Sequence, residues 1–149
     1  TIMHDGRVVQ AGDAGEMLSK PASALVARFL GFRNVMRCRC KRRPDGLYEL
    51  DIEGVKVLSV QGREGDVIMC LRAEDILLST EKPMTSARNV LEGRVVGLEQ
   101  KEHVFEVRVE VGPEVEFVSV ITPISREELG IRENARVYLA FKASSVKVI

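Results

Sequence analysis

The chain has 149 residues, of which 45% are hydrophobic and 30% are charged, a composition typical of a globular protein with one domain or two small ones. Lys plus Arg and Asp plus Glu both number 22, so the net charge gives no reason to expect nucleic acid or an anionic membrane as a partner. No apolar run approaches the roughly 20 residues that span a bilayer. Any affinity for anions must therefore come from a local cluster of side chains.

Residues 1–32 differ in pattern from the rest of the chain. Residues 1–10 predict a tight hairpin with Asp5-Gly6 as its turn. Asp13 opens a predicted short helix that Pro21 ends, and apolar residues recur at helical spacing over residues 22–30. The sequence starts in a predicted strand and without Met, so we expect it to be a segment of a longer protein.

From Asn34 onward the apolar residues alternate with polar ones, which predicts strands with one buried face. The only helix expected here has Ser125 as its N-cap and ends at Gly130. Many short strands with turn residues between them predict a mainly β fold forming a small barrel. The predicted strands are residues 34–41, 47–52, 55–60, 67–71, 76–79, 90–98, 104–111, 115–121, 136–141 and 146–149.

The three cysteines, Cys38, Cys40 and Cys70, lack the spacing of a metal site. Cys38 and Cys40 fall on the same face of a predicted strand, which suits small buried side chains. We expect core thiols, with metal binding or redox chemistry as the alternative.

The second part of the chain repeats the first. Residues 33–40 align with residues 88–95, and residues 67–76 align with residues 137–146. Two related half-barrels explain this pattern, with a chance similarity as the alternative. We expect the halves to cover residues 33–80 and 84–149 of one domain, residues 33–149.

The two copies differ at a point that decides where an anion can bind. Ser144 and Ser145 in the second copy donate hydrogen bonds, whereas Glu74 and Asp75 in the first copy only accept them and repel anions. If either copy binds an oxyanion, we therefore expect it to be the second.

Hydroxyl, guanidinium and ammonium groups flank two predicted strands of that half. Ser86 and Arg88 precede one strand, while Lys142 and Ser144 follow another, with no carboxylate among these donors. A small tetrahedral anion needs such a set, and each charge-assisted hydrogen bond contributes roughly 1.5–3 kcal/mol.

Each of these residues also has a purely structural interpretation. Arg88 and Lys142 are also consistent with surface charges, and the serines with loop hydroxyls. Asn89 is interpreted as structural, its amide closing a local turn. Ser125 is expected to cap a helix, although a helix N-terminus also attracts anions.

No catalytic set is recognisable. His4 and His103 fall in different regions, and no Gly-x4-Gly-Lys-Ser/Thr phosphate loop occurs. The sequence therefore predicts a binding module and not an enzyme.

Two groups of motifs resemble a known family. The hairpin segment Asp5-Gly6-Arg7-Val8-Val9-Gln10 and the following residues to Gly31 resemble the end of the nucleotide-binding domain of ATP-binding-cassette (ABC) importers. Residues 71–76 are similar to that family's RPED-I strand end, with Ala73 in place of Pro. Residues 85–96 and 142–146 resemble the molybdate- and tungstate-binding Mop repeat, so the rest of the chain looks like a TOBE/Mop-type regulatory domain.

The resemblance implies both a fold and a function. It implies OB-like barrels of two related halves, preceded by a hairpin and helices that belong to an ATPase domain. The parent protein would be the cytoplasmic ATPase subunit of a molybdate or tungstate importer, peripheral to the inner face of the cell membrane. It would work with a transmembrane permease and use ATP and Mg²⁺ only in the ATPase domain.

By the same resemblance, the regulatory domains pair as a homodimer and bind the oxyanion where they meet, which inhibits transport when the cell is replete. The implied ligand shell is Ser86, Ala87 through its backbone N–H, Arg88, Lys142 and Ser144, with Ser125 as a further member.

Two rival functions belong to other classes. Importer ATPases for other solutes carry a similar barrel that only dimerises or binds a regulatory protein. An OB-type nucleic-acid binder is the second rival, but it needs surface aromatic residues for base stacking, and the seven Phe and Tyr residues lie mostly in apolar strands.

Overall fold

The computed structural model describes residues 2–4, 7–10 and 30–149. Strands β1 (Ile2–His4) and β2 (Arg7–Gln10) pair in antiparallel fashion, as the predicted hairpin requires. The predicted turn at Asp5-Gly6 and the predicted helices, except for Leu30 at the end of the second, lie outside the described residues. Within the described part, no helix is long and apolar enough to cross a membrane.

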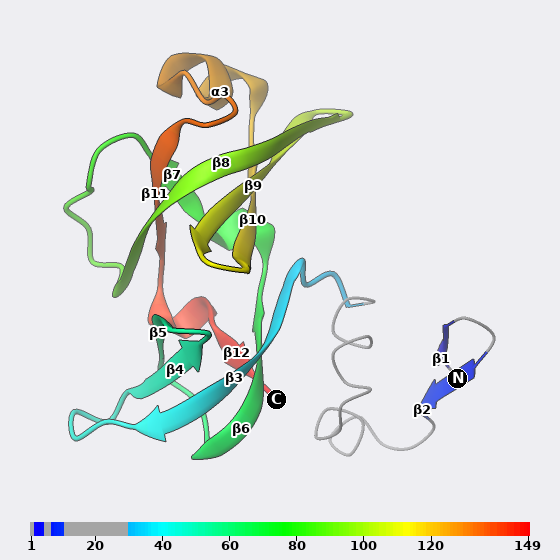
Figure 1. The fold of residues 1–149 in the computed structure, drawn as a ribbon, viewed down its shortest axis with the longest axis vertical. Helices are drawn as coiled ribbons and strands as arrows, with labels where there is room; N and C mark the ends of the chain where they lie inside the picture. Colours follow the sequence, from blue (N-terminus) through cyan, green and yellow to red (C-terminus); the bar gives the residue numbers. More distant parts are fainter. Residues whose placement is uncertain (1, 5–6, 11–29) are drawn as a thin grey trace.

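Residues 34–149 form two curled five-stranded sheets, as predicted for two half-barrels (Figure 1). The first sheet has the order β12-β6-β3-β4-β5, and the second has the order β10-β9-β8-β11-β7. The strands of the first sheet are β3 (Asn34–Arg42), β4 (Tyr48–Ile52), β5 (Val55–Ser59), β6 (Gly65–Leu71) and β12 (Lys147–Val148). Those of the second are β7 (Leu77–Ser79), β8 (Asn89–Lys101), β9 (Val104–Gly112), β10 (Val115–Ile121) and β11 (Arg136–Phe141).

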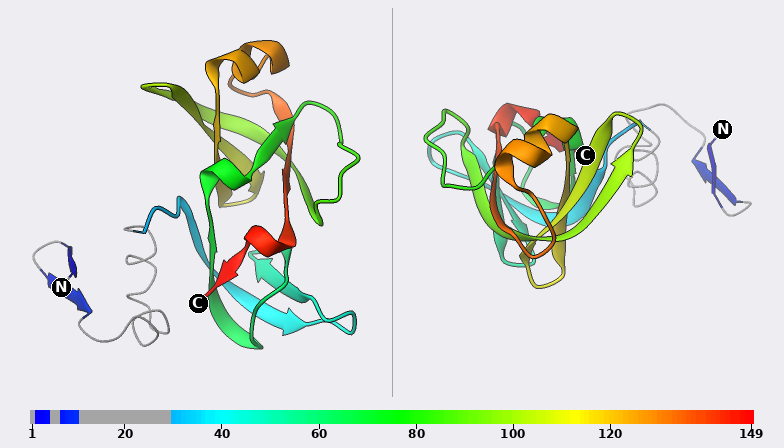
Figure 2. Two further views of the ribbon diagram at one scale, coloured as in Figure 1. Left: turned by 180° about the vertical axis from the view of Figure 1, so that it is seen from behind. Right: turned by 90° about the horizontal axis from the view of Figure 1, so that it is seen from above.

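Each half of the chain gives its last strand to the other half's sheet. From β6 the chain passes through the 3-10 turn η1 (Ala73–Asp75) into β7, which pairs with β11. From β11 it passes through the 3-10 turn η2 (Ala143–Ser145) into β12, which pairs with β6. Figures 1 and 2 show the two crossings side by side between the sheets. The halves are therefore interlocked and related by a pseudo-twofold arrangement.

The core lies between the concave faces of the sheets, because alternate residues of each strand point inward. Phe117 and Phe141 meet there with ring centroids 5.8 Å apart. Strand β6 is buried on both faces, since Ile68 and Cys70 pack on its outer side with Val35, Phe32 and Ile149. This double burial explains the continuous apolar run of this strand.

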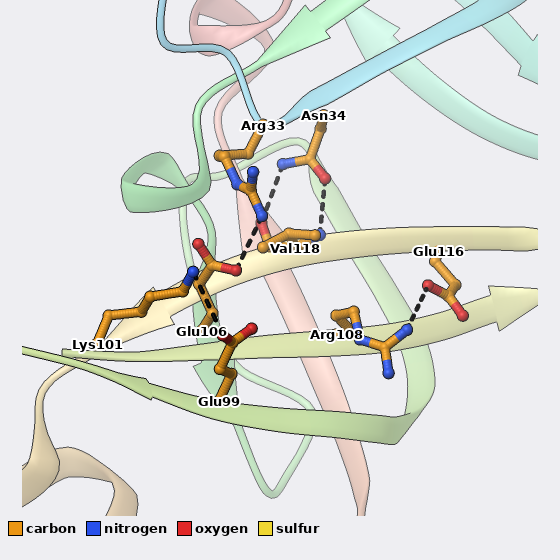
Figure 3. A network of polar contacts seen from close by, with 8 residues as sticks. All are labelled: Arg33, Asn34, Glu99, Lys101, Glu106, Arg108, Glu116 and Val118. Atoms are coloured by element: carbon orange, nitrogen blue, oxygen red, sulfur yellow. Dashed lines mark hydrogen bonds and ion pairs between the residues drawn. The ribbon is translucent and has the colours of Figure 1, made fainter. Parts of the chain in front are cut away.

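Two buried asparagines join the halves. The Asn34 amide group donates from Nδ2 to the Val118 carbonyl oxygen at 2.9 Å, and its Oδ1 accepts from the Val118 N–H at 2.7 Å (Figure 3). Its Nδ2 also donates to the Leu71 carbonyl oxygen at 3.2 Å. Asn89 repeats the pattern on Leu58, donating at 2.9 Å and accepting at 2.7 Å. The prediction of a local turn at Asn89 is wrong, because the amide pairs with strand β5 of the other half.

Two buried serines hold the crossing segments in the same reciprocal way. The Ser59 hydroxyl donates to the Val146 carbonyl oxygen at 3.1 Å, and the Ser119 hydroxyl donates to the Ile76 carbonyl oxygen at 2.8 Å. Because Ser59 and Ser119 occupy matching places in β5 and β10, these bonds confirm the repeat at the level of single atoms.

Helix α3 (Pro123–Leu129) begins two residues earlier than the predicted cap. Thr122 is the N-cap, and its Oγ1 accepts from the Ser125 N–H at 3.1 Å. The prediction of Ser125 as N-cap is therefore wrong; Pro123 at the first helical position is the sequence feature that marks this start. Gly130 ends the helix with φ of 65°, as predicted.

The thiols of all three cysteines are buried and free, which confirms the core interpretation. Burial raises the pKa of Cys38 from its ordinary 9.0 to about 12, and the nearby Cys40 adds to the effect. Burial also raises the pKa of Cys70 to about 11, and it raises the pKa of Cys40 above its ordinary value. The neutral thiol is the stable form in the fold.

We expect Asn34→Ala and Asn89→Ala each to lower the free energy of unfolding by about 1–3 kcal/mol, because each leaves backbone groups of the other half unpaired. Urea unfolding measures the change. Gln100→Ala is the matched control, since this exposed amide makes no hydrogen bond to the described residues; its effect should stay within about 0.5 kcal/mol. Equal effects at all three positions would contradict the joining role.

We expect Cys38 and Cys70 to resist alkylation at pH 8 in the folded protein and to react in denaturant, because the thiolate is the reactive form. Their folded pKa values lie above the unfolded ones, so their contribution to stability is complete below about pH 9 and is lost as the pH rises toward about 12. Mass spectrometry of alkylated protein and unfolding curves between pH 8 and 11 test both statements. Rapid alkylation of the native protein would show that the thiols are accessible.

Candidate oxyanion site

The pairing of β8 with β11 brings Arg88 and Lys142 to one end of the second sheet, where β8 begins and β11 ends. This end of the two strands is called the edge below. Asn89 pairs with Phe141 as the last step of this ladder. Arg88 immediately precedes Asn89, and Lys142 immediately follows Phe141, so the two cations continue the same register. Both side chains are exposed.

The segment after Lys142 is anchored on the first sheet. The Ala143 carbonyl oxygen accepts from the Val60 N–H at 3.3 Å, and the Ala143 side chain is buried. The Lys142 carbonyl oxygen accepts from the Ser145 N–H at 3.0 Å, which closes the 3-10 turn η2. This turn is therefore held rigidly while Lys142 and Ser144 remain exposed.

Ser86 and Ala87 precede Arg88 in the exposed connection from β7 to β8. The Ala87 N–H donates to the Thr85 hydroxyl at 3.2 Å. An anion bound at this N–H would have to displace that hydroxyl. The Ser86 side chain is exposed and makes no hydrogen bond to the described residues.

The charge at this edge is positive. In the part of the chain that the structure describes, Arg88 and Lys142 have no carboxylate within ion-pair distance, whereas Arg94, Arg108 and Arg136 on neighbouring strands do. The described residues also contain no cluster of His, Cys, Asp and Glu that would hold a metal ion. The positive charge of this edge would be neutralised by an anion.

Sequence reasoning missed a third cation. The Lys147 ammonium donates to the Ser144 carbonyl oxygen at 3.2 Å and so lies against η2. The spacing of three residues across a 3-10 turn is the feature that could have indicated it.

Ser125 does not join the other five predicted residues in the same chain. Strand β8 runs for 13 residues, on the order of 40 Å, with Arg88 beyond one end. Helix α3 follows Ile121, which pairs with Phe105, and Phe105 pairs with Gln100 near the opposite end of β8. Figure 1 shows α3 far from the crossing at η2.

The site is open in a single chain. Arg88, Lys142, Ser86 and Ser144 all face solvent, and water weakens the attraction of a charge pair several-fold relative to a covered site. A second surface over this edge would exclude water and strengthen the binding of an anion.

Comparison with known proteins places this geometry in a family. Residues 85–148 match the TOBE domain family, and this part of the chain is a TOBE domain. The chain is 40% identical over 147 residues to the molybdate/tungstate import ATP-binding protein WtpC of Pyrococcus abyssi, which covers 99% of the chain and 41% of that protein. The chain thus spans about two fifths of the length of this relative. The resemblance to the TOBE/Mop-type region of ABC importer ATP-binding subunits is confirmed.

Two other similarities bear on the ligand. The cytoplasmic molybdate-binding protein ModG, solved with molybdate bound, has a TM-score of 0.67 and 27% identity, covering 78% of this chain and 95% of that one. The spermidine/putrescine import ATP-binding protein PotA of Oleidesulfovibrio alaskensis is 39% identical over 82 residues, which are 52% of this chain and 22% of that protein. Similar sequences thus occur in import ATP-binding proteins that are named for different solutes.

Proposed function

We propose that residues 33–149 form the regulatory region of the ATP-binding subunit of a molybdate or tungstate importer. Residues 1–32 would be the end of its nucleotide-binding domain. The observation that carries the proposal is the joint placement of Arg88 and Lys142 at one sheet edge without a carboxylate partner among the described residues. The similarity to WtpC over nearly the whole chain supports the choice of ligand.

In this proposal the anion is held by charge and by hydroxyl donors. Arg88 and Lys142 neutralise the dianion, and the hydroxyls of Ser86 and Ser144 and the Ala87 N–H supply further hydrogen bonds. Lys147 adds positive charge beside Ser144. Ser125 lies too far away in the same chain, so it would contribute only from another copy.

A second copy of the regulatory region would cover the open edge, so the anion would bind at an interface of a homodimer. Such binding regulates transport only if one dimer arrangement binds the anion better than the other. The favoured arrangement would hold the ATPase subunits apart and inhibit uptake in a replete cell. The importer would place this region on the cytoplasmic side of the membrane beside its permease subunit.

The alternative is a dimerisation or regulatory-protein-binding domain of an importer ATPase for another solute, a function that the similarity to PotA supports. The two functions differ in the ligand. We expect tungstate and molybdate to raise the thermal unfolding temperature of the chain, and sulfate to have little effect. No shift with any of the three anions would favour the alternative.

We expect Arg88→Ala and Lys142→Ala each to abolish measurable tungstate binding by calorimetry, because each removes a charge-assisted hydrogen bond of roughly 1.5–3 kcal/mol from a small ligand. The circular dichroism spectrum should not change, since both side chains are exposed. Arg94→Ala is the matched control. It removes an exposed guanidinium from β8, the strand that Arg88 precedes, and this guanidinium already pairs with Glu110 at 3.7 Å. Unchanged affinity in both site variants would reject the site.

A further inference from the structure

We propose that the Glu106 carboxylate occupies, in the first half, the place that an oxyanion takes in the second half. The edge at Arg33 and Arg72 is then a latent anion site that a carboxylate from the second half of the same chain closes. This inference rests on the proposed function of the second half.

The pseudo-twofold arrangement gives the corresponding residues. Asn34 pairs with Leu71 in the first sheet as Asn89 pairs with Phe141 in the second. Arg33 precedes Asn34 as Arg88 precedes Asn89, so Arg33 corresponds to Arg88. Arg72 follows Leu71 as Lys142 follows Phe141, so Arg72 corresponds to Lys142. The first half thus retains two cations at the edge where the second half has its candidate site.

Both first-half cations are engaged within the chain. The Arg33 guanidinium donates to Glu106 Oε1 at 2.8 Å, and the Glu106 side chain is only 16% exposed (Figure 3). The Arg72 guanidinium lies over the Phe32 ring, 4.4 Å from its centroid. A carboxylate oxygen at this distance makes the same charge-assisted bond to Arg33 that an oxyanion would make.

The candidate site at Arg88 has no carboxylate at the position corresponding to Glu106. Val118 and Leu58 correspond, because each exchanges two hydrogen bonds with the asparagine of the other half. Val118 pairs with Arg108, and Leu58 pairs with Glu49. Glu106 lies two residues before Arg108, and Leu47 lies two residues before Glu49. The residue that corresponds to Glu106 is therefore the uncharged Leu47.

The crossing turns extend the same contrast. Turn η1 carries Glu74 and Asp75 where η2 carries Ser144 and Ser145. Lys147 of the second half corresponds to Leu77 in the first. The first-half edge therefore combines its two cations with three carboxylates, whereas the second-half edge has three cations and no carboxylate at the matching positions.

The experiment opens the latent site. The opened variant combines Glu106→Gln, Glu74→Ser and Asp75→Ser, and the tungsten bound per chain is measured by native mass spectrometry and elemental analysis. We expect twice the wild-type number of tungstate ions. In the Arg88→Ala background, which should bind none, the same three changes should restore the wild-type number.

The control and the contrary outcomes separate this inference from the proposed function. Glu110 lies on β9, as Glu106 does, and its carboxylate pairs with Arg94. Glu110→Gln should therefore leave the number of bound ions unchanged. An opened variant that folds and binds only the wild-type number overturns the latent site alone. A wild-type chain that binds no tungstate overturns both proposals. If the triple variant does not fold, Glu106→Gln in the Arg88→Ala background decides: tungsten scattering beside Arg33 in a crystal supports the inference, and none overturns it.

Discussion

The structure depends on two amide groups that hydrogen-bond across a pseudo-twofold axis. Asn34 and Asn89 each satisfy the N–H and the carbonyl oxygen of one residue on the third strand of the opposite half. These amides are buried, so an unmade bond would carry the full cost of desolvation. They fix where strands β3 and β8 begin, and the residue immediately before each, Arg33 or Arg88, is placed as a consequence. The same contacts that hold the halves together therefore position the candidate anion ligands.

This coupling links the candidate anion-binding edge of each half to the body of the other. Arg88 precedes an asparagine anchored on β5, and Lys142 precedes a turn anchored on Val60. Any force that an anion exerts on the second-half edge is thus transmitted to the first sheet through hydrogen bonds and not through a flexible loop. Such a rigid connection is what a sensor needs if a small ligand is to bias the arrangement of two large subunits.

Most of the fold was predictable because most of its strands alternate apolar and polar residues and its two halves retain aligned motifs. The predicted strands agree with the structure, and the alignment of residues 33–40 with 88–95 matches β3 with β8. The exchange of β7 and β12 was not predictable, since a local pattern shows that a strand exists and not which sheet accepts it. The predicted start of α3 was wrong because Thr122 and Ser125 both carry hydroxyls that can cap a helix, and Thr122 is the one that does so.

The candidate site was predictable only in part. Arg88, Lys142 and the serines stood out as donors without carboxylates, and the β8–β11 register brings them to one edge. Lys147 was not predicted as part of the site because its ammonium contacts η2 through a hydrogen bond to the Ser144 carbonyl oxygen. The partner of Arg33 lies 73 residues away in sequence, at Glu106, a separation that no local motif reveals.

The exchange of β7 and β12 is the arrangement expected if two identical halves were joined into one chain. A single half could satisfy the contacts of β7 or β12 only by lending its last strand to a second identical molecule, as in a domain-swapped dimer. Joining two such molecules in one gene would preserve every contact while freeing each copy to mutate alone. In this chain the two copies share the architecture and differ at the crossing turns, where η2 carries hydroxyls and η1 carries carboxylates.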